Sequence, residues 1–138
     1  MRQVTDRALW VGHVGDLLAV GAIMSAGIEA IIELADNEQF TVLPRELVRG
    51  RFPLSDGGDN PLWLLRLAAD TVAVLLKAEV PVLVCCSAGM SRSLCVAAGG
   101  LVLNEGLSLP EALSIVVGNG PADVSPGVLV QMQAALTA

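Results

Sequence analysis

The stretch VPVLVCCSAGMSRSLCVAAGG, Val80–Gly100, decides the fold that this sequence predicts. It opens with residues 80–84, which are apolar throughout and predict a central strand buried on both faces. Two adjacent cysteines, Cys85 and Cys86, follow, and small residues then lead to a lone arginine, Arg92. A second apolar run of helical composition comes next. A strand, a short loop and a helix in this order are typical of an α/β domain whose chemistry lies at the carboxyl ends of the strands.

The rest of the chain alternates between strand-like and helix-like segments. Apolar runs predict further strands at 8–11, 28–34, 41–43 and 48–54, and helical patterns predict helices at 17–26, 61–78, 91–105, 108–117 and 125–135. Asp16 is expected to cap the first helix, and Asn60 followed by Pro61 marks the start of the second. We therefore expect one domain, residues 1–138, with a central, mostly parallel sheet flanked by helices.

Composition excludes several classes of partner. The net charge is −6, which disfavours nucleic acid and anionic membrane surfaces, because both require a basic face. No run reaches the ~20 apolar residues of a membrane-spanning helix. Three clustered cysteines, Cys85, Cys86 and Cys95, make a poor disulfide framework and suit a reducing, cytoplasmic compartment. The single histidine, His13, is distant in sequence and is expected in a turn, so we expect neither a metal site nor another cofactor.

The loop between the predicted strand and helix has the composition of an anion site. Backbone N–H groups of a tight loop that leads into a helix all point inward, and the helix dipole adds partial positive charge there. Gly89 allows the backbone to turn and to approach a ligand closely. Arg92 can donate two parallel hydrogen bonds to an oxyanion. The expected phosphate-binding residues are Ser87, Ala88, Gly89, Met90, Ser91 and Arg92.

Cys86 is the better candidate nucleophile of the two adjacent cysteines. It is expected at the first position of the loop, where the loop amides, the helix dipole and Arg92 all favour the thiolate. Cys85 belongs to the strand, where the two-residue period points its side chain opposite to that of Val84, and it lies outside the loop that collects the donors. We expect Cys85 and Cys95 to be small apolar residues of the interior, with a resolving thiol at Cys95 as the alternative.

The sequence resembles the cysteine-dependent dual-specificity phosphatases of the protein-tyrosine phosphatase superfamily. The segment CSAGMSRS, with Cys86, five intervening residues, Arg92 and Ser93, is similar to their phosphate-binding loop. The segments LWVGHVGD, AGIEAIIELA, FPLSDGGDN, SLPEALSIV and VSPGVLVQM resemble other parts of the same family, so the resemblance covers most of the chain.

This resemblance implies a mechanism and a role for each matching residue. Cys86 would attack phosphorus and form a phosphocysteine, while Arg92 and the loop amides would hold the phosphoryl oxygens. Ser93 would donate a hydrogen bond to the Cys86 sulfur. Asp56 is the expected general acid, because it follows a predicted strand thirty residues before the cysteine, with Asp59 as the competitor. The expected substrates are phosphoproteins, phosphorylated on tyrosine with or without serine and threonine, or small phosphate esters.

The sequence also departs from the family. Cys85 stands where the family normally has a histidine that supports the thiolate, so we expect a smaller thiolate fraction at Cys86. The segment 118–126 lacks the arginine that many family members carry there, and the chain has no tyrosine. A catalytically impaired phosphoprotein-binding domain is therefore the alternative function. A thiol redox or sulfur-transfer protein fits the spacing poorly.

Overall fold

The computed structural model describes residues 1–137, and its core is a five-stranded mixed sheet. The strands are β1 (Arg2–Gln3), β2 (Leu9–His13), β3 (Ala30–Ala35), β4 (Val48–Leu54) and β5 (Val82–Cys86). They lie in the order β1-β2-β5-β3-β4, and only β1 runs antiparallel to its neighbour. The expected α/β fold with a central, mostly parallel sheet is therefore confirmed, with β5 as the central, fully buried strand.

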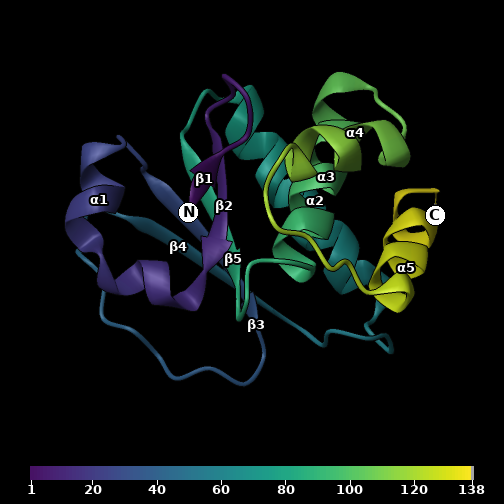
Figure 1. Ribbon diagram of the computed structural model, residues 1–138, viewed down its shortest axis with the longest axis horizontal. Helices are drawn as coiled ribbons and strands as arrows, with labels where there is room; N and C mark the ends of the chain where they lie inside the picture. The colour runs from purple at the N-terminus through teal and green to yellow at the C-terminus, as the bar shows by residue number, and fades with distance from the viewer. Residues whose placement is uncertain (138) are drawn as a thin grey trace.

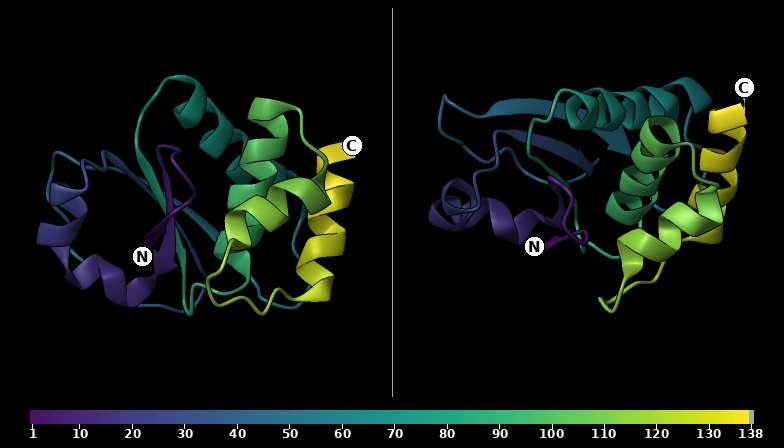
Figure 2. Two further views of the ribbon diagram at one scale, coloured as in Figure 1. Left: turned by 45° about the horizontal axis from the view of Figure 1, so that its top comes forward. Right: turned by 90° about the horizontal axis from the view of Figure 1, so that it is seen from above.

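Helices cover both faces of the sheet, as Figures 1 and 2 show. One face carries α2 (Leu62–Lys77), α3 (Arg92–Glu105), α4 (Leu109–Val117) and α5 (Pro126–Thr137). The other face carries the 3-10 helix η1 (Val14–Leu18) and the short helix α1 (Val20–Ser25), over a smaller apolar cluster. None of the described helices is both long and apolar enough to cross a membrane.

The central helix α3 packs closely against α2 because small residues line the contact. A Cβ atom on Gly100 would lie 2.8 Å from the Cβ atom of Val72 in α2, and one on Gly99 would lie 2.9 Å from the sulfur of Met132 in α5. These distances are shorter than real side-chain contacts. The apolar side of α2 repeats at helical spacing and buries Leu65, Ala68, Ala69 and Val72. This packing fixes the N-terminal end of α3 beside the end of β5.

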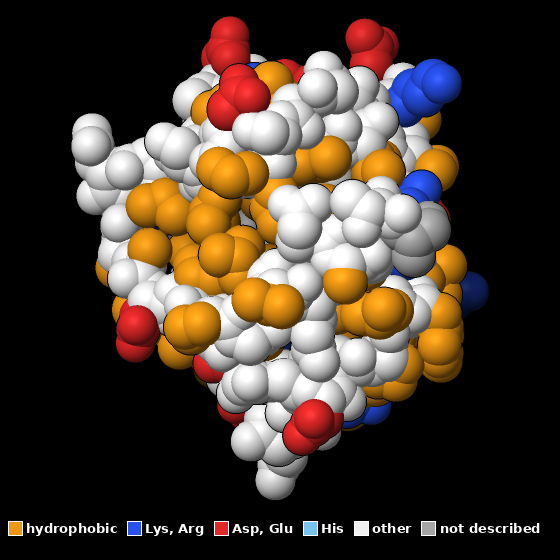
Figure 3. Space-filling view, turned by 90° about the vertical axis from the view of Figure 1, so that its right-hand side faces the viewer, with side chains coloured by type: hydrophobic (Ala, Val, Ile, Leu, Met, Phe, Trp, Pro, Cys, Tyr) orange, Lys and Arg blue, Asp and Glu red, His pale blue; other side chains and the backbone are white. Residues whose placement is uncertain are grey.

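Apolar side chains also gather on the outer surface of α4 and α5. They line a groove of about 550 Å³ in which Leu113, Leu129 and Val130 take part. Figure 3 shows this face of the molecule. The groove lies away from the end of β5 and does not contribute to the site described below.

One expected strand, in the β3–β4 connection, was wrong, and one short strand was missed. Residues 41–43 form no strand, because β4 pairs directly with β3 and leaves them no strand to pair with. Val42 is 82% exposed and packs against no part of the sheet. The segment is instead an irregular loop, held by a hydrogen bond from Arg49 to the carbonyl of Thr41. The missed strand is β1, which is only two residues long and has no apolar run to predict it.

Helix capping differs from expectation at two places. Asp16 does not cap a helix over 17–26; His13 caps η1, its Nδ1 accepting the Gly15 N–H, and Asp16 accepts the His13 N–H instead. Asn60 is not the N-cap of α2, which is Pro61. The Asn60 side chain binds both the N–H and the carbonyl of Ser55 and so closes the loop between β4 and α2.

Candidate active site

The end of β5 turns its two cysteines toward opposite faces of the sheet. Cys86 is the last residue of β5, not the first loop residue as expected, and is 2% exposed on the side of α2–α5. Cys85 lies in the apolar cluster on the α1 side and pairs in register with Glu33 of β3. Because side chains alternate between the two faces of a strand, these adjacent thiols lie on opposite faces of the sheet, in different apolar clusters.

The loop after β5 wraps around the sulfur of Cys86. The N–H of Gly89 lies 3.3 Å from Sγ and the N–H of Ser93 lies 3.4 Å from it. Gly89 has φ +73°, and a Cβ atom there would lie 2.9 Å from the carbonyl carbon and oxygen of Gly12 in β2. Only glycine accepts both this conformation and this approach. The backbone of the loop thus presents hydrogen-bond donors to a sulfur that would carry negative charge as a thiolate.

Arg92 begins α3, and its guanidinium group is nearly buried. Its Nη1 donates to the carbonyl of Leu54 at 2.8 Å and to the carboxylate of Asp36 at 3.2 Å, while the side chain is 8% exposed. Its Nε is buried and has no partner among the described residues. Buried donors are almost always satisfied in proteins, so an oxyanion seated in the loop is a natural partner for this group.

Asp56 contacts the phosphate-binding loop, and Asp59 does not. The hydroxyl of Ser91 donates to Asp56 Oδ1 at 2.7 Å and accepts the Ser125 N–H at 2.9 Å. Asp59 adopts φ +63°, and its carboxylate makes no hydrogen bond or ion pair with the described residues. Ser91 therefore joins the loop of Asp56, the loop after β5 and the segment before α5.

The hydroxyl of Ser93 does not donate to the Cys86 sulfur in this structure. It is buried and has no partner among the described residues, and only the backbone N–H of Ser93 approaches the sulfur. Ser87, at the start of the loop, contacts Asn37 at 3.5 Å between Oγ and Oδ1. The remaining expected loop residues, Ala88 and Met90, contribute backbone; the Met90 carbonyl accepts the Asp123 N–H.

Three residues at the site were not singled out from the sequence: Asp36, Asn37 and Ser125. Asp36 and Asn37 follow β3 directly, at the carboxyl edge of the sheet where polar residues often bind ligands. Polar residues directly after an apolar strand can be read from the sequence, so these two could have been found. Nothing in the sequence indicated that the Ser125 N–H would reach Ser91.

The two remaining cysteines are held in their neutral forms. Burial raises the pKa of the Cys85 thiol far above its ordinary value, and the nearby Glu33 carboxylate raises it further. Burial, with a smaller contribution from Asp56, raises the pKa of Cys95 to about 12. The Cys95 thiol lies 3.8 Å from the carbonyl of Val128 within the interior. Neither thiol has the exposed, electropositive surroundings of a reactive cysteine.

The fold is shared with solved phosphatase structures. No family model and no curated protein matches the sequence. Human DUSP28 superposes with a TM-score of 0.87 at 24% identity, over 99% of this chain and 96% of that chain. A mouse putative dual specificity phosphatase, solved in complex with zinc tungstate, gives 0.85 at 23% identity, over 98% and 85% of the two chains. The human tyrosine phosphatase-like serine/threonine/tyrosine-interacting protein gives 0.80 at 18% identity, over 97% and 93%. The fold expected from the resemblance is confirmed, and this chain has the fold of the dual-specificity phosphatases.

Proposed function

We propose that this protein hydrolyses phosphate monoesters through a phosphocysteine at Cys86. The observation that carries the proposal is the loop itself. The loop places the Cys86 sulfur against the backbone N–H groups of Gly89 and Ser93, and it ends at Arg92, whose buried Nε has no partner among the described residues. A nucleophile and fixed oxyanion donors in a single loop are the arrangement that phosphoryl transfer requires.

In the first step the Cys86 thiolate attacks phosphorus. The S–P bond forms while the bond from phosphorus to the leaving oxygen breaks, and Arg92 with the loop amides stabilises the charge on the other phosphoryl oxygens. Asp56, in its protonated form, gives its proton to the leaving oxygen. Its hydrogen bond from Ser91 holds the carboxyl group beside the loop for this transfer.

In the second step water attacks the phosphocysteine. Asp56, now a carboxylate, takes a proton from that water, the new P–O bond forms and the P–S bond breaks. Inorganic phosphate leaves, and Cys86 returns to the thiolate. The backbone N–H groups of Gly89 and Ser93 stabilise the departing sulfur. We expect Ser93 to add its hydroxyl at this stage, when the sulfur regains its negative charge.

The proposed substrates are phosphoproteins, with phosphotyrosine as the first to test. The loop lacks lysine, which disfavours polyanionic headgroups such as those of phosphoinositides. The mouse neighbour was solved in complex with zinc tungstate, and tungstate is an oxyanion, as phosphate is. The near-complete overlap with human DUSP28 supports a single phosphatase domain over residues 1–138. The three free cysteines support a reducing, cytoplasmic compartment.

Turnover of a small aryl phosphate tests this function directly. We expect wild-type activity between pH 5 and 8, and a loss of at least about 1,000-fold in Cys86→Ser and in Arg92→Ala. Rapid quenching followed by intact-mass measurement should detect one added phosphoryl group, which Cys86→Ser removes.

Asp56→Asn and Asp59→Asn form a matched pair for the general acid. We expect Asp56→Asn to lower kcat by about 100-fold on phenyl phosphate and less on an aryl phosphate with a better leaving group, since a good leaving group needs less protonation. Asp59→Asn should leave both rates unchanged. No wild-type turnover on any phosphate monoester would reject the enzyme, and equal losses in the two variants would reject the assignment of Asp56.

A further inference from the structure

A second cavity adjoins the phosphate-binding loop on the α1 side of the sheet. It has a volume of about 510 Å³ and lies between η1, the carboxyl half of β3, the part of β4 that carries Arg49 and Arg51, and the loop that joins these strands. Asn37, which lines it, contacts Ser87 of the phosphate-binding loop. The cavity is within the size range of ligand pockets. Nothing in the proposed chemistry at Cys86 uses it.

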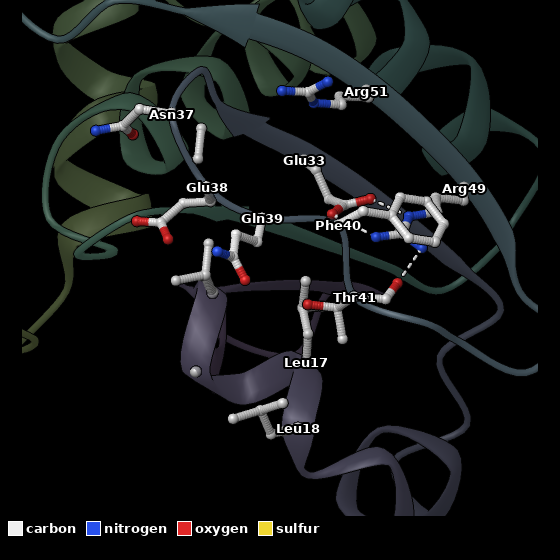
Figure 4. Close-up of a pocket in the computed structure, with 13 residues that line it drawn as sticks. Leu17, Leu18, Glu33, Asn37, Glu38, Gln39, Phe40, Thr41, Arg49 and Arg51 are labelled. Atoms are coloured by element: carbon white, nitrogen blue, oxygen red, sulfur yellow. Dashed lines mark hydrogen bonds and ion pairs between the residues drawn. The ribbon is translucent and has the colours of Figure 1, made fainter.

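The cavity is polar at the end beside Asn37 and apolar along η1 (Figure 4). Asn37 and Glu38 lie together on one side of it, Leu17 and Leu18 lie on η1, and the ring of Phe40 lies beside Arg49 on the side away from Asn37. Phe40 is 77% exposed and Leu18 is 79% exposed. Large apolar side chains so exposed at the rim of a cavity gain free energy when a ligand covers them.

The charged groups of the cavity favour a neutral occupant. Arg49 pairs with Glu33, lies under the ring of Phe40 at 4.1 Å from its centroid, and donates to the Thr41 carbonyl. These contacts hold Arg49 against the ring of Phe40 before any ligand arrives. The two other charged residues, Arg51 and Glu38, form no ion pair with the described residues. Because their charges have opposite signs, the cavity has no net charge from them that would attract a charged ligand.

We propose that this cavity binds a large apolar side chain of the phosphorylated substrate, close in sequence to the residue whose phosphate enters the Cys86 loop. The inference rests on the function proposed above and names its substrate class: phosphopeptides with a leucine or an aromatic residue flanking the phosphorylated residue. The Asn37 contact with Ser87 makes the two sites continuous. The polar end lies along the substrate backbone, and Leu18 with Phe40 enclose the flanking side chain.

Phosphotyrosine peptides that differ at one flanking position test this inference. The set places Phe, Ser, Glu or Lys at each of roughly three positions before and after the phosphotyrosine, and p-nitrophenyl phosphate serves as a substrate with no flanking residue. We expect Phe at one of these positions to raise kcat/KM about tenfold over Ser, as an apolar pocket does for a well-fitting side chain.

Exposed residues provide the variants and the control. Phe40→Ala and Leu18→Ser should each reduce the Phe-over-Ser preference to about twofold or less and leave p-nitrophenyl phosphate turnover unchanged. Val130→Ala, at a residue 69% exposed on α5, should change neither. No preference for Phe at any position, or a preference that survives both variants, overturns the inference. A stronger preference for Glu or Lys, lost on changing Arg51 or Glu38, overturns the apolar occupant.

A binding measurement separates this inference from the proposed catalysis. The same Phe and Ser peptides, carrying a non-hydrolysable phosphotyrosine analogue, are titrated into the protein by calorimetry. A Phe-dependent affinity that Phe40→Ala removes would support the cavity even if wild-type protein shows no turnover. Turnover of every peptide at equal kcat/KM, with equal affinities, would retain the phosphatase and reject the cavity.

Discussion

Replacing Gly89 by alanine tests whether the approach of the phosphate-binding loop to β2 sets the geometry at Cys86. The new Cβ atom would lie 2.9 Å from both the carbonyl carbon and the carbonyl oxygen of Gly12. Favourable contacts between carbon atoms lie at about 3.5–4.0 Å, so the overlap is about 0.6 Å or more. Because the obstacle is strand backbone and not a flexible side chain, the loop must move.

The magnitude follows from two separable costs. A left-handed conformation costs a residue with a Cβ atom roughly 1–2 kcal/mol, and an overpacked contact adds about 1–3 kcal/mol. Gly106 provides a matched control, since it has the same φ of +73° as Gly89 but no atom within 4 Å of its Cβ position. We therefore expect Gly106→Ala to lose roughly 1–2 kcal/mol and Gly89→Ala about 2–5 kcal/mol of unfolding free energy.

Thermal unfolding and aryl phosphate turnover measure the two consequences. At about 3–5 °C per kcal/mol for a chain of this length, Tm should fall further in Gly89→Ala than in Gly106→Ala. Moving the loop also withdraws the Gly89 N–H from the Cys86 sulfur, and a displacement of about 1 Å lowers the rate by about 100-fold. Equal Tm values and equal kcat/KM in the two variants would refute this reasoning.

Three further outcomes follow from packing, hydrogen bonding and titration. Ser91→Ala should lower kcat by about tenfold, because Asp56 loses its only side-chain hydrogen bond among the described residues. The loss should be larger for a substrate with a poor leaving group than for one with a good leaving group, and steady-state rates on two aryl phosphates measure it. Gly100→Ala should destabilise the protein by about 1–3 kcal/mol, because the new Cβ atom would overlap Val72 of α2. Gly21→Ala, in α1 with open space around the new Cβ atom, should stabilise the protein by roughly 0.5–1 kcal/mol. Urea unfolding of the two variants and the wild type measures both effects. Since burial raises the pKa of Cys95 to about 12, the stability from its neutral thiol is fully present below about pH 9 and is lost as pH rises toward 12, by about 1.4 kcal/mol per pH unit. Unfolding curves from pH 8 to 10.5 should show a shallower decline in Cys95→Ala, and an identical decline would contradict the assignment.

The sequence determined the architecture because its strongest patterns are local. The apolar run of β5, the small residues of the loop and the helical composition of α3 together specify a strand, a turn and a helix, whatever else the chain does. The different settings of Cys85 and Cys86 were also expected, although Cys86 proved to be the last residue of β5 and not a loop residue. Segments with weak local patterns were missed or wrong, such as the two residues of β1 and the loop at 41–43.

Only the tertiary structure decided which side chains meet. The sequence favoured Asp56 over Asp59 by its position, but the contact with Ser91, thirty-five residues after Asp56, is seen only in the structure. Asp36 and Ser125 join the site from β3 and the start of α5 in the same way. Sequence spacing carries no information about such contacts, because they depend on the packing of α3 against its neighbours and on where parallel strands end along one edge. The loop around the proposed nucleophile, Cys86, is thus encoded locally, while the residues that meet this loop depend on the assembled sheet.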